Sequence, residues 1–142
     1  MDVGMGIVRG LEAALAGLEE VREALHVADI TAEALSALPV TRLPCGLLAV
    51  GLARRRGSWQ TDVGPRVLWS LPVQVGVAVL LPAHGGQLER LAGWGRRLDA
   101  LLEQASGWSA LAAEVRRTGP PASLCRGLAG CVHQSLEISY MA

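Results

Sequence analysis

The segment Arg66-Val-Leu-Trp-Ser-Leu-Pro-Val-Gln-Val-Gly-Val-Ala-Val-Leu-Leu81 determines the fold class. Every second residue over 73–81 is valine or leucine, which predicts a β-strand with a β-branched stripe on one face. Ala78 and Leu80 occupy the other face, so we expect both faces of the sheet to be covered. Pro72 lacks the amide hydrogen that a sheet ladder needs, which places it at a bulge or a strand end.

Two further segments predict strands. The apolar run Cys45–Ala53 is followed by Arg54-Arg55-Arg56-Gly57, which we interpret as the start of an exposed loop that continues to about Pro65. The two strands on either side then form a hairpin with an arginine-tipped loop. Over 132–140, apolar and polar side chains alternate, and this pattern predicts a strand with one apolar and one polar face.

Apolar residues at steps of three and four predict helices. The first is an amphipathic helix from Met5 to about Leu25. A second, short helix is expected to begin after a cap at Asp29 or Thr31 and to run through Leu38, where Pro39 stops it.

A third helix is expected over about 87–105, with Gly107 as its C-terminal cap. Its apolar face consists of leucines: Leu88, Leu91, Leu98, Leu101 and Leu102. Gly93 and Gly95 each weaken such a helix by roughly 1 kcal/mol relative to alanine, and we interpret them as points of close approach to the sheet.

These elements predict an α+β fold in a single domain over residues 1–142. A small mixed β-sheet, made of the hairpin plus the C-terminal strand, has helices packed on one face. A chain of 142 residues suits one such domain. The segment Trp108–Arg117 is equally compatible with helix and strand, and the composition of Thr118–Ala122 predicts a loop.

The balance of charge bears on the class of partner. The chain has 13 basic and 13 acidic residues, whereas a sequence-independent nucleic-acid binder normally has a basic excess. We therefore expect no binding to free DNA, and no sequence-specific nucleic-acid partner. Hydrophobic residues reach 51%, and charged residues are only 18% against a usual share of about 25%. This shortage of charge suggests that other subunits cover part of the surface. Alanine enrichment from a GC-rich genome is the alternative explanation.

Cysteine usage and hydropathy predict a cytoplasmic protein. Cys45, Cys125 and Cys131 are an odd number of cysteines, which we interpret as reduced, small apolar residues. The longest apolar stretch, 67–81, is shorter than the roughly 20 residues of a membrane-spanning helix. Asp2 and the lack of a basic lead do not fit a signal peptide.

Motifs for catalysis or cofactor binding are not evident. Gly4–Gly10 does not follow a strand and lacks the spacing of a dinucleotide fingerprint. Cys125, Cys131 and His133 match no structural zinc pattern, so we expect buried side chains there and neither a metal nor a cofactor. We therefore expect no enzyme, although a small enzyme or ligand-binding domain stays open because sites assemble in space.

Arg54, Arg55 and Arg56 form the sharpest charge feature. They fit a solvated hairpin tip that blocks edge aggregation. They also fit a contact with a neighbouring chain, or with DNA passing through an assembly. Trp59 lies close by, and exposed tryptophan with arginine is typical of interface anchors. These four residues are the candidate protein interface.

The order of elements resembles that of the tail-terminator and minor tail proteins of long-tailed bacteriophages and their prophages. The resemblance rests on the opening helix Ile7–Leu25, the strand Val73–Leu81 with its Pro-Gly turn, the helix Leu88–Leu102 and the closing strand that ends in Leu136-Glu-Ile-Ser-Tyr140. It is a resemblance of pattern over most of the chain, without a diagnostic motif.

The resemblance implies a non-catalytic structural subunit that forms a ring, often a hexamer. Such a ring caps the tail tube, stops its growth and joins it to the head, so the implied partners are further copies, the tail tube protein and head connector proteins. The implied location is the bacterial cytoplasm during assembly and then the virion tail. Another head–tail joining or neck protein is the nearest alternative.

Overall fold

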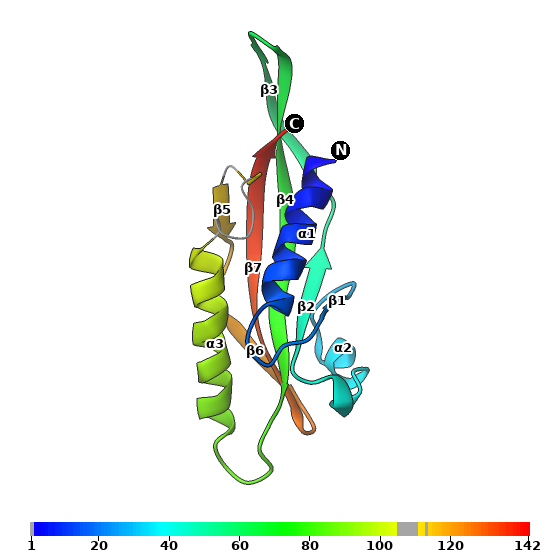
Figure 1. Ribbon diagram of the computed structural model, residues 1–142, viewed down its shortest axis with the longest axis vertical. Helices are drawn as coiled ribbons and strands as arrows, with labels where there is room; N and C mark the ends of the chain where they lie inside the picture. The colour runs from blue at the N-terminus through cyan, green and yellow to red at the C-terminus, as the bar shows by residue number, and fades with distance from the viewer. Residues whose placement is uncertain (1, 105–110, 113) are drawn as a thin grey trace.

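The computed structural model describes residues 2–104, 111–112 and 114–142 and confirms the α+β fold with a mixed β-sheet (Figure 1). The helices are α1 Val3–Ala16, α2 Ala32–Ser36 and α3 Gln87–Glu103, with a 3-10 turn η1 at Val40–Arg42. The strands are β1 Ala24–His26, β2 Cys45–Val50, β3 Arg54–Thr61, β4 Gly64–Leu80, β5 Glu114–Arg117, β6 Ala122–Arg126 and β7 Ala129–Met141. None of the helices in these described ranges is long and apolar enough to cross a membrane.

Two long antiparallel strands, β4 and β7, form the spine of the sheet. They pair continuously from Leu68 with Met141 to Leu80 with Ala129. The other edge of β4 carries β2 and β3 one after the other, and the other edge of β7 carries β6 and β5. β1 joins β2 in parallel, which makes the sheet mixed, with the order β1-β2-β4-β7-β5.

The larger core lies on the face of the sheet that α1 and α3 cover. The valine stripe of β4 points into it, and Val77 and Ile138 are completely buried there. A smaller core lies on the opposite face, where Leu35 of α2 belongs to the same cluster as Ala78. The two long helices therefore pack on one face of the sheet, as expected. The short α2 packs on the opposite face, over Ala78.

The first helix is shorter than its sequence pattern indicates. It begins at the N-cap Asp2, whose carboxylate accepts a hydrogen bond from the Gly4 amide at 2.9 Å, and it ends at Ala16 rather than near Leu25. Gly17 is the C-cap, and Leu25 lies in β1. In α2, Thr31 is the cap: its hydroxyl accepts from the Ala34 amide at 3.1 Å.

The expected loop over 54–65 is wrong, because Arg54–Thr61 forms β3. The hairpin partner of β4 is thus split into β2 and β3, and the turn lies at Asp62-Val63. Pro72 lies inside β4 and not at a bulge or strand end, so that expectation is wrong. Its carbonyl accepts from the Gly51 amide at 2.8 Å on the side of the split, and on the other side Pro72 pairs with Glu137 of β7. The bulge of this hairpin lies instead on β3, between Arg55 and Gly57.

Helix α3 matches the expected range, but two expectations about its faces are wrong. Leu88 is 80% exposed, and Trp94 takes a place on the buried face instead. Gly93 and Gly95 do not touch the sheet: an added Cβ would meet nothing within 4 Å at Gly95 and only the end of the Arg96 side chain at Gly93.

The chain after α3 contains two short strands that pair with β7. Of the ambiguous segment Trp108–Arg117, the described part 114–117 is strand β5, and the proposed cap Gly107 lies outside the described residues. Strand β6, at Ala122–Arg126, was not expected from the sequence.

Candidate functional site: a projecting two-stranded arm

The β3–β4 hairpin extends beyond the end of the sheet as an arm, here residues 58–66. β7 ends where Met141 pairs with Leu68, and the last bonds to it join Val67 and Ala142, N to O at 3.1 Å in both directions. Beyond this point only β3 and β4 pair with each other, from Ser58 with Val67 to Thr61 with Gly64. Figure 1 shows the hairpin rising above the arrowhead of β7.

The turn of the arm is tight and specified by its residues. Thr61 pairs with Gly64, so Asp62 and Val63 are the two loop residues. Gly64 has φ 113°, a conformation that residues with a Cβ rarely adopt, and the Thr61 hydroxyl donates to its carbonyl at 2.7 Å. The arm is therefore a defined structure and not an irregular loop.

Apolar side chains of the arm are exposed. Trp59 is 46% exposed, and its ring lies over Gly57, where an added Cβ would be 3.9 Å from it. Val63 at the turn is 79% exposed. An isolated two-stranded hairpin is at best marginally stable in water, so an arm of this kind gains stability when it packs against another surface.

The base of the arm is tied to the sheet by a carboxylate between two arginines. Glu137 on β7 lies 3.2 Å from the Arg56 guanidinium through one oxygen and 3.2 Å from the Arg116 guanidinium through the other. Arg56 is the residue at the bulge of β3. Glu137 thus links β3, β7 and β5, of which only β5 and β7 pair directly.

The same contacts change the acidity of Glu137. A hydrogen bond from Ser70 and the positive charges of Arg116 and Arg56 hold the pKa of the Glu137 carboxyl below its usual value, against a smaller opposing effect of desolvation. Glu137 is therefore ionised over the whole physiological pH range, and its contact with the base of the arm persists there.

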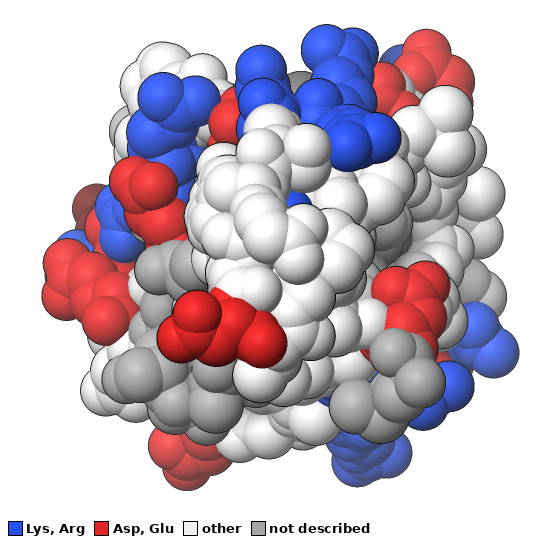
Figure 2. Space-filling model, turned by 90° about the horizontal axis from the view of Figure 1, so that it is seen from above, with Lys and Arg blue, Asp and Glu red and all other residues white. Residues whose placement is uncertain are grey.

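The four residues of the predicted interface lie on β3 but not at a hairpin tip. Arg54 and Arg55 pair with Ser70 and Trp69 of β4, at the base of the arm. Their side chains, and that of Arg66 on the arm, are exposed and take part in none of the hydrogen bonds or ion pairs among the described residues. Trp59 lies on the arm itself. Viewed from the arm end, several basic side chains lie along one edge of the molecule, others lie near the opposite edge, and mainly uncharged surface occupies the middle (Figure 2).

Cys125 lies on β6, and Cys131 and His133 lie on its partner strand β7. Within the described part of the chain, no three His, Cys, Asp or Glu side chains are close enough to hold a metal ion. Cys131 is buried, but the expectation that Cys125 is buried is wrong, because it is exposed on β6. Burial raises the pKa of the Cys131 thiol to about 12 and that of Cys45 to about 11.

A shallow hollow lies between α1 and α3, near the end of α1. It has a volume of about 470 Å³. Small and apolar residues make up most of its wall, with a charged rim: Ala14, Gly17, Leu18, Ala100, Leu101, Gln104, Glu19 and Arg97. The loop after α1 also carries Glu20, Arg22 and Glu23, and Arg97 of the hollow lies 4.0 Å from Glu20.

Sequence reasoning missed Glu137 and Arg66. Glu137 is a polar position in an alternating strand, and only the pairing of β7 with β4 and β5 brings it near two arginines. Arg66 was placed at the start of a strand in the sheet, because the projecting part of β4 looks like any other strand in sequence.

The models of known protein families do not match this chain, and no curated protein is significantly similar to it.

Proposed function

We propose that this chain is a structural subunit that associates with copies of itself through the arm. The observation that carries the proposal is the projection of residues 58–66 beyond the last pair of β7 with β4, with Trp59 and Val63 exposed on it. In an assembly the arm packs against another subunit, which gives it the stabilising contact that a free hairpin lacks. The low share of charged residues, 18%, supports the same proposal.

The more specific proposal is a subunit of a phage or prophage tail that acts as a tail terminator. Its support is the resemblance in the order of elements, together with an arm suited to joining subunits. In this role copies form a ring that caps the tail tube, stops its growth and binds the head connector. Assembly takes place in the bacterial cytoplasm, and the ring stays in the virion tail.

An arm-shortened variant tests this role directly. Residues 59–66 are replaced by Asn-Gly, a sequence that favours a two-residue hairpin turn. Ser58 and Val67 then flank the new turn, and the bonds between Val67 and Ala142 are retained. The variant therefore removes the arm and leaves every pair between β4 and β7 in place.

The experiment uses the strain that encodes the protein. With the gene deleted, we expect electron micrographs to show tails of uncontrolled length and heads without tails. The wild-type gene restores joined particles, whereas the arm-shortened gene does not. Joined particles with tails of normal length in the deletion strain would contradict the tail-terminator role.

A further inference from the structure

Two segments of this chain carry opposite net charge. Residues 54–70, which make up the arm and its base, contain four arginines and one aspartate, a formal charge of +3. Residues 1–33 contain seven acidic residues and two arginines, a formal charge of −5 with histidine neutral. The neutral total therefore combines a basic segment with an acidic one.

The acidic charge is concentrated after α1. Glu19, Glu20 and Glu23 lie in the loop from α1 to β1, which we call the acidic loop. Glu19 and Glu20 are exposed, and Arg22 in the same loop leaves it a formal charge of −2. Glu23 lies 3.6 Å from Arg42 and Glu20 lies 4.0 Å from Arg97, the limit of an ion pair, so part of this charge is already paired. The hollow between α1 and α3, lined in part by Glu19, adjoins this loop.

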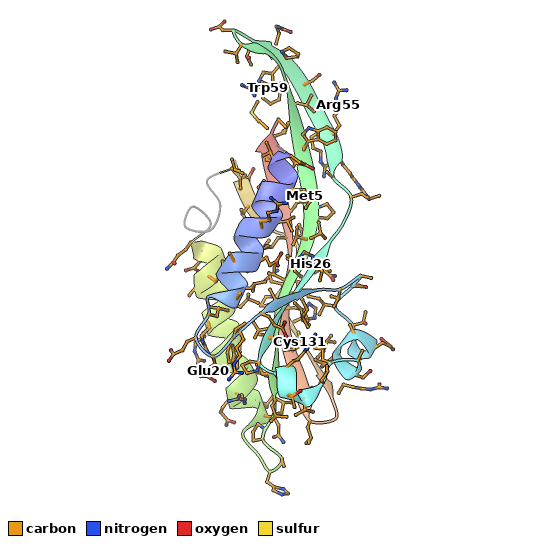
Figure 3. All side chains as sticks on the ribbon, turned by 45° about the vertical axis from the view of Figure 1, so that its right-hand side comes forward. Met5, Glu20, His26, Arg55, Trp59 and Cys131 are labelled. Atoms are coloured by element: carbon orange, nitrogen blue, oxygen red, sulfur yellow. The ribbon has the colours of Figure 1, made fainter. Side chains whose placement is uncertain are left out.

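Within one chain the arm cannot reach this loop. Figure 3 shows Arg55 and Trp59 near one end of the molecule and Glu20 in the opposite half. Among the described residues, the pair of Arg56 with Glu137 is the one ion pair that the basic side chains of residues 54–70 form.

We infer that the arm of one copy docks on the acidic loop and the adjoining hollow of the next copy. Arg54, Arg55 and Arg66 face the carboxylates of the loop, and Trp59 provides the apolar anchor in the hollow. Tryptophan and arginine are the residues most enriched in the energetic centres of protein interfaces. This inference rests on the proposed self-association and adds the receiving surface.

The two surfaces are different parts of the same chain, so the contact is head-to-tail. An open head-to-tail chain of copies leaves one arm and one acidic loop free, until a ring closes or two copies exchange arms about a two-fold axis. The charges also select the partner, because an arm meeting another arm places like charges together.

Charge reversal at the two surfaces tests the inference. The arm variant is Arg55→Glu with Arg66→Glu, and the loop variant is Glu19→Arg with Glu20→Arg. A control, Arg126→Glu with Ser123→Glu and Leu128→Glu, makes the same change in net charge as the arm variant at exposed positions of the β6–β7 hairpin, away from both surfaces. We measure the dissociation constant of self-association by sedimentation velocity at 0.05 and 0.5 M salt, with circular dichroism to confirm the fold.

The inference predicts that the arm and loop variants each weaken self-association on the order of tenfold or more, and that the control does not. A mixture of the arm and loop variants, in which every contact joins opposite charges, regains association. The wild-type association weakens at the higher salt, because ions screen exposed charges.

Other outcomes overturn it. If the wild type associates and the arm and loop variants associate equally well, the receiving surface is wrong while the proposed function stands. If the wild type stays monomeric, both the proposed receiving surface and the proposed self-association are wrong. If self-association is unchanged but the arm variant loses binding of a 30-base-pair DNA duplex that the wild type and the control bind, the arm is a nucleic-acid contact instead.

Discussion

Arg56 and Glu137, which are 81 positions apart in the sequence, form an ion pair of 3.2 Å between two strands that do not pair with each other. Arg56 is the bulge residue of β3, and Glu137 lies on β7 beyond the intervening strand β4. The contact crosses the sheet at the base of the arm and links β3 to β7.

Substitution Glu137→Gln should reduce stability most at neutral pH. The folded-state pKa of Glu137 is lowered, so its contribution is present above the usual carboxyl pKa of about 4.3 and is lost as pH falls through the folded value. Below that pH the wild type and the variant should converge. Urea unfolding from pH 7 to pH 3 measures this, and a constant difference between the two proteins over this range would contradict it.

Leucine-to-alanine substitutions at two helical positions test which faces are buried. Leu11 of α1 is 0% exposed, and Leu88 of α3 is 80% exposed. We expect Leu11→Ala to lower the free energy of unfolding by about 2–5 kcal/mol, because it leaves a cavity in the core. Leu88→Ala should change it by less than about 0.5 kcal/mol. The free energy of unfolding is measured by denaturant titration. A comparable loss at both positions would show that Leu88 is buried, as the sequence predicts.

Two glycines that sequence cannot distinguish should respond oppositely to alanine. At Gly76 of β4, an added Cβ would lie 2.9 Å from the Val132 carbonyl oxygen, a backbone atom that cannot easily move. Gly76→Ala should therefore destabilise the protein by about 1–3 kcal/mol. Gly95 of α3 has open space, so Gly95→Ala should stabilise it by about 0.5–1 kcal/mol. The melting temperatures of the two variants decide this, and a shift in the same direction for both would count against it.

The three thiols should differ in reactivity. Cys125 is exposed, while Cys45 and Cys131 are buried, with thiol pKa values raised to about 11 and about 12. A thiolate is the reactive form, so at pH 8 the native protein should react with an aromatic disulfide reagent at one thiol. Cys125→Ser should abolish that fast reaction, and denaturant should expose all three thiols. Two fast thiols in the native wild type would show that one of the buried cysteines is accessible.

The sequence predicted elements best where one local pattern dominated. The valine alternation of β4, the polar/apolar alternation of β7 and the range of α3 were all correct, because side-chain burial follows directly from the period of each element. The end of α1 was wrong for an identifiable reason. Val21 is buried in the loop at a position that continues the helical period, although Gly17 has already ended the helix.

The candidate site was less predictable than the fold. Three arginines followed by glycine favour a loop locally, but pairing with β4 holds them in β3, where tertiary contacts override local preference. The projection of the arm depends on where β7 ends relative to β4, and the pairing of Glu137 depends on register. Both are long-range relationships. The sequence therefore suffices to propose Arg54–Arg56 and Trp59 as an interface, but it does not predict where these residues lie in the fold.

The central claim is that the arm joins copies of this chain, and the mass in solution tests it most directly. Light scattering coupled to size exclusion, at micromolar protein and low salt, should give the wild type a mass several times the 14.9 kDa of one chain. The arm-shortened variant, with the same far-ultraviolet circular dichroism, should elute as a monomer. A wild type that remains at 14.9 kDa throughout, or an arm-shortened variant that associates as strongly as the wild type, would contradict the claim.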